Sequence, residues 1–171
     1  MKSIKHTLNE ISLNFNTLAE TSVPQIEEAS KLMLKTLKNG GKIMFCGNGG
    51  SASDAQHLSA ELVGRYMKNR KPLASVSLTT DTSIITAISN DFTFDDVFSR
   101  QVESIGNEGD LLYAISTSSR SKNVINAIKV AKKMNIKTLG ITGNNDDGFR
   151  DICDVIINTP ALRPDRIQEM H

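Results

Sequence analysis

With 171 residues, the chain is long enough to bury most of its apolar surface in one core, whereas a second independent domain would be cramped. Twenty Lys and Arg side chains against 19 Asp and Glu give a net charge of +1, so no global field attracts the chain to nucleic acid or to an anionic membrane. Small molecules that are recognised locally are therefore the expected partners.

Two observations predict a cytoplasmic location. The N-terminal "MKSIKHTLNEISLNF" is interrupted by polar residues, and no run approaches the ~20 apolar residues that a membrane span needs. Cys46 and Cys153 lie in apolar runs without the spacing of a metal site, which is typical of reduced cysteines in a cytosolic protein.

Apolar residues recur at intervals of three and four between residues 6 and 39, and this spacing predicts helices. Pro24 lies where a second helix would begin, and the Asn-Gly-Gly at 39–41 would end it. We expect residues 1–40 to form an antiparallel helix pair with an apolar face.

Beyond residue 41 the pattern changes to short apolar runs separated by helix-like segments. The runs are "KIMFCG", "ASVSLTT", "DLLYAIST", "IKTLGITG" and "DVIINT". Strands that alternate with helices predict the α/β class, with a five-stranded parallel, doubly wound sheet over residues 41–171. No repeat or linker divides the chain, so residues 1–171 are expected to form one domain. Ligands of such sheets bind where strands lead into helices.

A glycine-rich turn follows the first run, with glycines at 47, 49 and 50. These glycines would allow a ligand to approach the backbone closely, and Ser51 and Ser53 could cap the next helix. The turn has neither the GxGxxG pattern nor the lysine of a Walker A loop, so an ordinary tight turn explains it equally well.

A second loop, "STSSRS" at 116–121, carries hydroxyl groups where a helix is expected to begin near Ser121. Together with the free amides of a helix start, these hydroxyls can converge on a phosphate group, and Arg120 adds a charged donor. A loop that only caps the helix is the alternative. Capping a helix needs only one hydroxyl, so the presence of several hydroxyl groups in this loop favours a phosphate site.

His57 and Glu61 lie four residues apart on a helix expected from about Ser53 to Tyr66, so both side chains leave the same face. An imidazole nitrogen and a carboxylate oxygen suit zinc, or an acid/base couple. By spacing alone, an exposed hydrogen-bonded pair is the commoner arrangement.

Near the end, "RPDRIQEMH" places Asp165 as the expected N-cap of a helix, with Gln168 at the capping-box position. Barely two turns would follow, which is too short for a helix to be stable without tertiary contacts. We therefore expect the chain to be a fragment of a longer protein, cut within this helix.

Four segments carry a wider resemblance: "CGNGGSASDAQHLSAELVGRY", "SNDFTFDDVFSRQVE", "GDLLYAISTSSRSKNVI" and "DRIQEMH". In this order they resemble the sugar isomerase (SIS) domain and, within it, the phosphoheptose isomerases. The resemblance covers almost the whole chain and implies a flavodoxin-like sheet. It also implies an aldose–ketose isomerase that converts sedoheptulose 7-phosphate into D-glycero-D-manno-heptose 7-phosphate, for bacterial lipopolysaccharide or capsule.

The resemblance further implies roles for single residues. Glu61 would be the catalytic base, and zinc would be held by His57, Glu61 and Gln168. The substrate would be bound by Asn48, Gly49, Gly50, Glu61, Arg65, Asn90, Asp91, Ser116, Thr117, Ser118, Ser121, Asp165 and Gln168. A homotetramer built around the N-terminal helix pair, with sites between subunits, is also implied.

The chain departs from the family pattern twice. Ser119 and Arg120 replace a Gly-Asn in the phosphate loop; because serine tolerates positive φ less well than glycine, the loop is expected to differ in shape or to gain a contact from Arg120. The family also places a further histidine five residues beyond His171, as the last zinc ligand and general acid. Three protein ligands can still hold zinc when water fills the fourth position.

Proteins of other classes remain as alternatives. A tetrameric SIS-domain replication factor, which binds the bacterial initiator, resembles the chain and shares its "RIQEMH" ending but lacks a glutamate at the position of Glu61. Glu61 therefore favours the enzyme. A non-catalytic sensor of sugar phosphates would instead show ligand-induced stabilisation without turnover.

Overall fold

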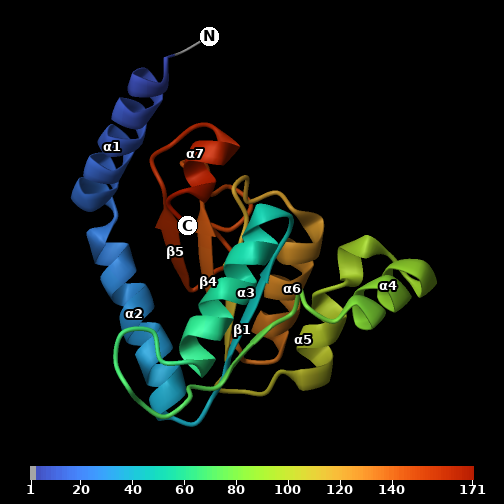
Figure 1. Ribbon diagram of the computed structural model, residues 1–171. Helices are drawn as coiled ribbons and strands as arrows, with labels where there is room; N and C mark the ends of the chain where they lie inside the picture. The colour runs from blue at the N-terminus through green and yellow to red at the C-terminus, as the bar shows by residue number, and fades with distance from the viewer. Residues whose placement is uncertain (1–2) are drawn as a thin grey trace.

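In the computed structural model, which describes residues 3–171, five strands form a single sheet (Figure 1). The strands are β1 (Ile43–Gly47), β2 (Ser75–Ser77), β3 (Leu111–Ile115), β4 (Lys137–Thr142) and β5 (Val155–Asn158). Their order is β2-β1-β3-β4-β5, and every neighbouring pair is parallel. The predicted α/β class and five-stranded parallel sheet are thus confirmed.

Both faces of the sheet are covered, which explains why its strands are continuous apolar runs. Along β1, Ile43 and Phe45 point into one apolar layer, and Met44 and Cys46 point into the other. The first layer is completed by helices α2 and α3, and the second by α5 and α6. These helices span Val23–Lys38, Gly50–Val63, Ser99–Ile105 and Lys122–Lys133.

The N-terminal helices are present, but they are not antiparallel. Helix α1 (Ile4–Thr21) and α2 follow each other nearly end to end along one side of the sheet (Figure 1). Only Ser22 lies between them, whereas an antiparallel helix hairpin needs a loop of about two to five residues. The Ser22 hydroxyl donates to the carbonyl of Asn158 at 2.7 Å, which attaches this junction to β5.

Two of the connections differ from simple strand–helix alternation. Between β2 and β3 the chain forms α4 (Thr82–Asp91), which projects away from the sheet, then a 3-10 turn at Phe94–Asp96 and α5 (Figure 1). Between β4 and β5, residues 143–154 form turns rather than a helix. The "GNNDDG" within them is a strong turn signal, and the buried Phe149 anchors the segment.

The strand order reverses direction between β1 and β3, so the loops after these two strands separate at the same edge of the sheet. Such a switch point is where open α/β sheets bind ligands. The short helix α7 (Pro164–Gln168) lies near this edge as well (Figure 1). Within residues 3–171, no helix is long and apolar enough to cross a lipid bilayer.

Candidate active site

The loop after β1 turns directly into α3. Gly49 has φ 58° and ψ −120°, a conformation that glycine adopts readily and residues with a Cβ avoid. No side chain caps the helix at this end. Because of this turn, α3 begins at Gly50, earlier than the predicted Ser53, and Gly64 ends it before the predicted Tyr66. Ser51 therefore lies inside the first helical turn instead of capping it.

The loop after β3 gathers hydroxyl groups at the start of α6, as predicted. The hydroxyls of Ser116 and Ser121 are 3.2 Å apart, and Ser121 is the N-cap of α6 without a side-chain capping bond. The amide N–H of Arg120 donates to the Ser118 hydroxyl at 3.3 Å, and the Arg120 side chain is exposed. Hydroxyl groups at a helix start without a side-chain cap are an arrangement suited to an anion.

Ser119 corrects the expectation that serine would avoid a glycine conformation in this loop. It adopts φ 53° and is fully buried. Its hydroxyl donates to the carbonyl of Asn145 at 3.1 Å and accepts from the N–H of Gly148 at 3.3 Å. Hydrogen bonds to the 145–148 turn thus hold a serine in the left-handed region.

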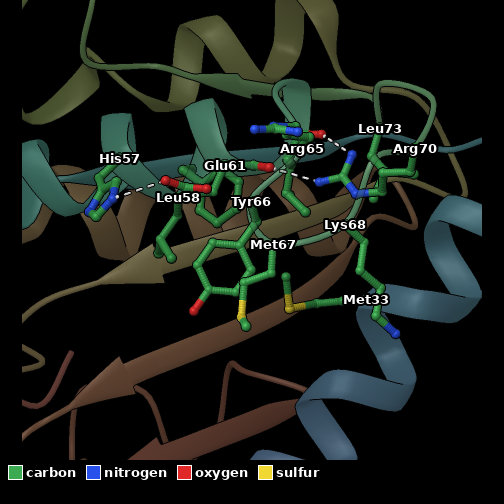
Figure 2. A pocket seen from close by; sticks show the side chains of 12 residues that line it. Met33, His57, Leu58, Glu61, Arg65, Tyr66, Met67, Lys68, Arg70 and Leu73 are labelled. Atoms are coloured by element: carbon green, nitrogen blue, oxygen red, sulfur yellow. Dashed lines mark hydrogen bonds and ion pairs between the residues drawn. The ribbon is translucent and has the colours of Figure 1, made fainter.

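His57 and Glu61 do share one face of α3, and Figure 2 shows their side chains pointing toward each other. The distance from His57 Nε2 to Glu61 Oε1 is 3.4 Å, and the two side chains are 76% and 39% exposed. Asp54 precedes them by one turn of the same helix. Burial raises the pKa of the Asp54 carboxyl, although the nearby His57 acts in the opposite direction.

Gln168 comes to the same helix from α7. Its amide nitrogen donates to Oδ2 of Asp54, and the hydroxyl of Ser51 donates to its amide oxygen at 3.4 Å. Gly50 makes room for this contact, because a Cβ there would lie 2.7 Å from the same amide oxygen. The first turn of α3 is therefore the docking point of α7.

A cavity of about 690 Å³ opens beside α3 (Figure 2). His57, Glu61 and Arg65 supply polar groups to a wall that is otherwise largely apolar. Arg70 holds the end of α3 by donating to the carbonyls of Glu61 and Leu62 at 2.7 and 2.8 Å. The remaining lining residues are Met33, Phe45, Leu58, Leu62, Tyr66, Met67, Lys68, Arg70 and Leu73.

Not all predicted site residues meet within one chain. The 116–121 loop does not contribute to the wall of the 690 Å³ cavity, so the hydroxyl groups and the His57–Glu61 pair line no common cavity here. Asn90 and Asp91 lie at the end of the projecting α4, where the Asn90 amide donates to the Asp91 carboxylate at 2.8 Å. Both side chains are exposed.

The start of α7 differs from the capping-box prediction. Arg163 is the N-cap and Pro164 the first helical residue, so Asp165 lies within the first turn. The Asp165 carboxylate accepts from the guanidinium groups of Arg163 and Arg166, at 2.6 and 3.1 Å, instead of capping the backbone.

Sequence reasoning missed the contacts of Asp54 and Asn123. Asp54 had a usable signal, because it lies one helical turn before His57. The amides of Asn48 and Asn123 exchange two hydrogen bonds of 2.8 Å between the loop after β1 and the first turn of α6. The side chain of His171 is largely buried, and this burial lowers its pKa to about 4.

With the switch-point loops, the parallel sheet and the α3 face described, comparison with known proteins defines the class. The family model described as "SIS domain" matches residues 8–143. Phosphoheptose isomerase from Aliarcobacter butzleri is 53% identical over 152 residues, or 89% of this chain and 80% of the relative. A relative of the same name from Campylobacter jejuni is 54% identical over 86% of this chain and 79% of its own length. The chain belongs to the phosphoheptose isomerase family of SIS-domain proteins.

Solved structures agree with this assignment. A phosphoheptose isomerase from Neisseria gonorrhoeae superposes with a TM-score of 0.92 at 43% identity, and one from Francisella tularensis with 0.94 at 33% identity. Each match covers 98% of this chain and 90% of the other. The Vibrio vulnificus NanR protein, at 19% identity and a TM-score of 0.62, shares the fold alone.

Proposed function

We propose that the protein is an aldose–ketose isomerase that converts sedoheptulose 7-phosphate into D-glycero-D-manno-heptose 7-phosphate. The observation that carries this proposal is the Glu61 carboxylate beside His57 on the cavity wall, in a chain 53% identical to a phosphoheptose isomerase. A carboxylate at this position can act as a base in proton transfer. A protein that only binds a sugar phosphate would not need such a base.

The reaction moves a carbonyl group from C2 to C1, through removal of a proton from C1 and its return at C2. Glu61 is the proposed base for this transfer, because its carboxylate is near an imidazole in a largely apolar cavity. Arg65, on the same wall, would stabilise the negative charge that develops on the enediolate oxygen.

The phosphate end of the sugar would be held by Ser116, Thr117, Ser118 and Ser121. The position of these hydroxyls at the start of α6, where Ser121 makes no side-chain capping bond, supports this assignment, since a helix start attracts an anion. Anchoring the phosphate far from the reacting carbons would orient the head of the sugar. Asn48, Gly49, Gly50, Asp165 and Gln168 would complete the binding of the sugar chain.

The donor atoms on α3 fit a zinc ion. Two ligands of tetrahedral zinc, each about 2.0–2.1 Å from the metal, lie about 3.3 Å apart; His57 Nε2 and Glu61 Oε1 are 3.4 Å apart. Residues 3–171 offer no cluster of three His, Cys, Asp or Glu side chains. The third ligand that the family resemblance implies is Gln168, through its amide oxygen. Bound zinc would polarise the substrate carbonyl.

The complete sites would lie between subunits of a homotetramer. Ile4, Leu8 and Phe15, which share one face of α1, are 82%, 61% and 44% exposed, and no residue of α1 is buried. An apolar stripe of this size favours contact with another copy. The projecting α4 would then bring Asn90 and Asp91 to a neighbouring site. Residues 1–171 would form one SIS domain, with 1–40 serving oligomerisation.

An isomerase assay with purified protein and sedoheptulose 7-phosphate tests the proposal, with metal content measured on the same sample. We expect the aldose product, bound zinc, and loss of turnover on chelation. Thermal stabilisation by the substrate without product would instead identify a sugar-phosphate sensor. Capture of the replication initiator without product would identify the non-catalytic binder.

A cytoplasmic setting remains part of the proposal. Both cysteines are free thiols, and burial raises the pKa of Cys153 to about 12, so neither is suited to rapid oxidation. The substrate, a phosphorylated sugar, is also a metabolite that does not cross membranes unaided. Fractionation of native host cells, followed by detection of the protein in the cytoplasmic fraction, would test this location.

A further inference from the structure

We propose that Asn123 is a positioning residue, which couples the loop that holds the phosphate to the loop that holds the sugar. This inference rests on the proposed isomerase function, and it assigns Asn123 no contact with the reacting atoms. Through Asn123, the two switch-point loops would keep a fixed relationship while a phosphorylated sugar is bound across them.

The contact is a reciprocal pair of amides. Nδ2 of Asn48 donates to Oδ1 of Asn123 at 2.8 Å, and Nδ2 of Asn123 donates to Oδ1 of Asn48 at 2.8 Å. Oδ1 of Asn123 also accepts from the N–H of Val124 at 2.9 Å. Because each amide must present its donor to the other's acceptor, neither can rotate by 180° without losing both bonds.

Burial makes this pair a stiff connection. Asn123 is only 2% exposed, so water is poorly placed to replace a lost partner. An unpaired polar group at such a site costs more free energy than the pair itself contributes. The two side chains therefore hold each other in one arrangement.

The pair joins the two ends of the proposed substrate site. Asn123 lies two residues after Ser121, in the first turn of α6, where the phosphate would be bound. Asn48 directly precedes Gly49, whose φ of 58° and ψ of −120° shape the loop that would receive the sugar. A flexible glycine loop needs an external restraint, and the Asn48 side chain supplies it through Asn123.

Loss of this restraint should affect turnover more than binding. In Asn123→Ala, the hydroxyl groups and amides of the phosphate loop remain, so we expect KM to change by less than about threefold. The sugar loop loses its anchor, and a displacement of the order of 1 Å can lower a rate by about a hundredfold; we expect kcat to fall at least about tenfold.

Asn126→Ala is a matched control. Asn126 lies on the same helix, and its amide also makes one tertiary hydrogen bond, to the carbonyl of Asp95 at 3.1 Å. This bond ties α6 to the 3-10 turn and not to the sugar loop. If the effect of Asn123 were only loss of stability, both variants would behave alike; we expect kcat of Asn126→Ala to stay within about twofold of the parent.

Amide hydrogen exchange of residues 47–52 gives a readout that needs no turnover. We expect faster exchange there in Asn123→Ala than in Asn126→Ala. Asn123→Asp, which keeps the acceptor for Val124 and a favourable first-turn charge, provides a folded variant should alanine not be tolerated, and its exchange should also rise. Unchanged exchange overturns the inference, as does unchanged kcat in an active parent. A parent without isomerase activity contradicts the proposed function alone, because the exchange measurement still decides the role of Asn123.

Discussion

Gln168 and Asp54 are joined by a hydrogen bond that connects α7 to the first turn of α3. The residues are 114 positions apart in the sequence, and α7 has only five residues, too few for a helix that is stable alone. This contact, together with the buried Ile167, therefore decides where α7 lies. A proposed zinc ligand thus depends on a neighbouring carboxylate for its orientation, which is a common arrangement around metal sites.

Gly50→Ala should disturb Gln168 without harming the fold. The new Cβ would lie 2.7 Å from the Gln168 amide oxygen, so the flexible end of that side chain must move. Alanine suits a helix better than glycine, so we expect thermal stability to be retained. We expect zinc content to fall and turnover to drop by about tenfold or more, because a metal ligand that is no longer held in its orientation binds the metal less well. Metal analysis and the isomerase assay measure both effects.

A double variant shows whether Gly50→Ala acts through Gln168. If it does, Gly50→Ala combined with Gln168→Ala should be no less active than Gln168→Ala alone, because two changes in one contact are not additive. Independent, multiplicative losses would refute this explanation.

Glu61→Gln tests the proposed base. The amide keeps nearly the same shape but cannot accept a proton from carbon, so we expect turnover to fall by about a hundredfold or more. Binding of sedoheptulose 7-phosphate, measured by calorimetry, should be retained because the phosphate loop is untouched. Glu103→Gln, an exposed glutamate on α5, is the control and should keep full turnover. Normal turnover in Glu61→Gln would exclude Glu61 from proton transfer.

Ser119 offers a test of backbone strain in the phosphate loop. Ser119→Ala removes both hydroxyl contacts and keeps a Cβ at φ 53°, so we expect a loss of about 1–3 kcal/mol in the free energy of unfolding. Ser119→Gly loses the same contacts but relieves the left-handed strain, and we expect it to be about 1 kcal/mol more stable than the alanine variant. Urea unfolding compares the two. A glycine variant that is the less stable one would contradict the left-handed conformation.

The helices and strands were predictable because their signals are local. Five apolar runs gave five strands, and the three-and-four spacing gave α1 and α2. Their relative direction was not predictable from spacing, since it depends on a single linking residue, Ser22. The early start of α3 was hidden for a similar reason: the backbone angles of Gly49 decide it, and the sequence shows only that such angles are allowed.

The candidate site was predictable only in part. Helical spacing correctly placed His57 and Glu61 on one face, and hydroxyl residues marked the start of α6. The contacts of Asn48 with Asn123 and of Asp54 with Gln168 join residues 75 and 114 positions apart, and no local pattern reports such pairs. They arise from the strand order, which brings distant loops to one edge of the sheet.

Asp154 should make the stability of the sheet depend on pH. Its carboxylate accepts three hydrogen bonds of 2.8 Å, from Lys137 Nζ and from the N–H and hydroxyl of Thr138, so it joins the starts of β4 and β5. Partial burial alone would raise the pKa of Asp154, but these bonds outweigh burial and hold the pKa below its ordinary value. The folded state therefore favours the charged form.

The sign of the effect follows from this lowered pKa. The stabilisation is fully present above the ordinary Asp value of about 3.9 and is lost as the pH falls through the lower value of the folded state. At pH 7 we expect Asp154→Asn to be less stable by about 1 kcal/mol, since partial exposure screens the pair with Lys137. The difference should shrink below pH of about 4, where the parent loses its charge. Asp151→Asn, an exposed carboxylate on the same loop, should show no such trend in urea unfolding. A difference that persists unchanged at low pH would show that Asp154 acts through packing instead of charge.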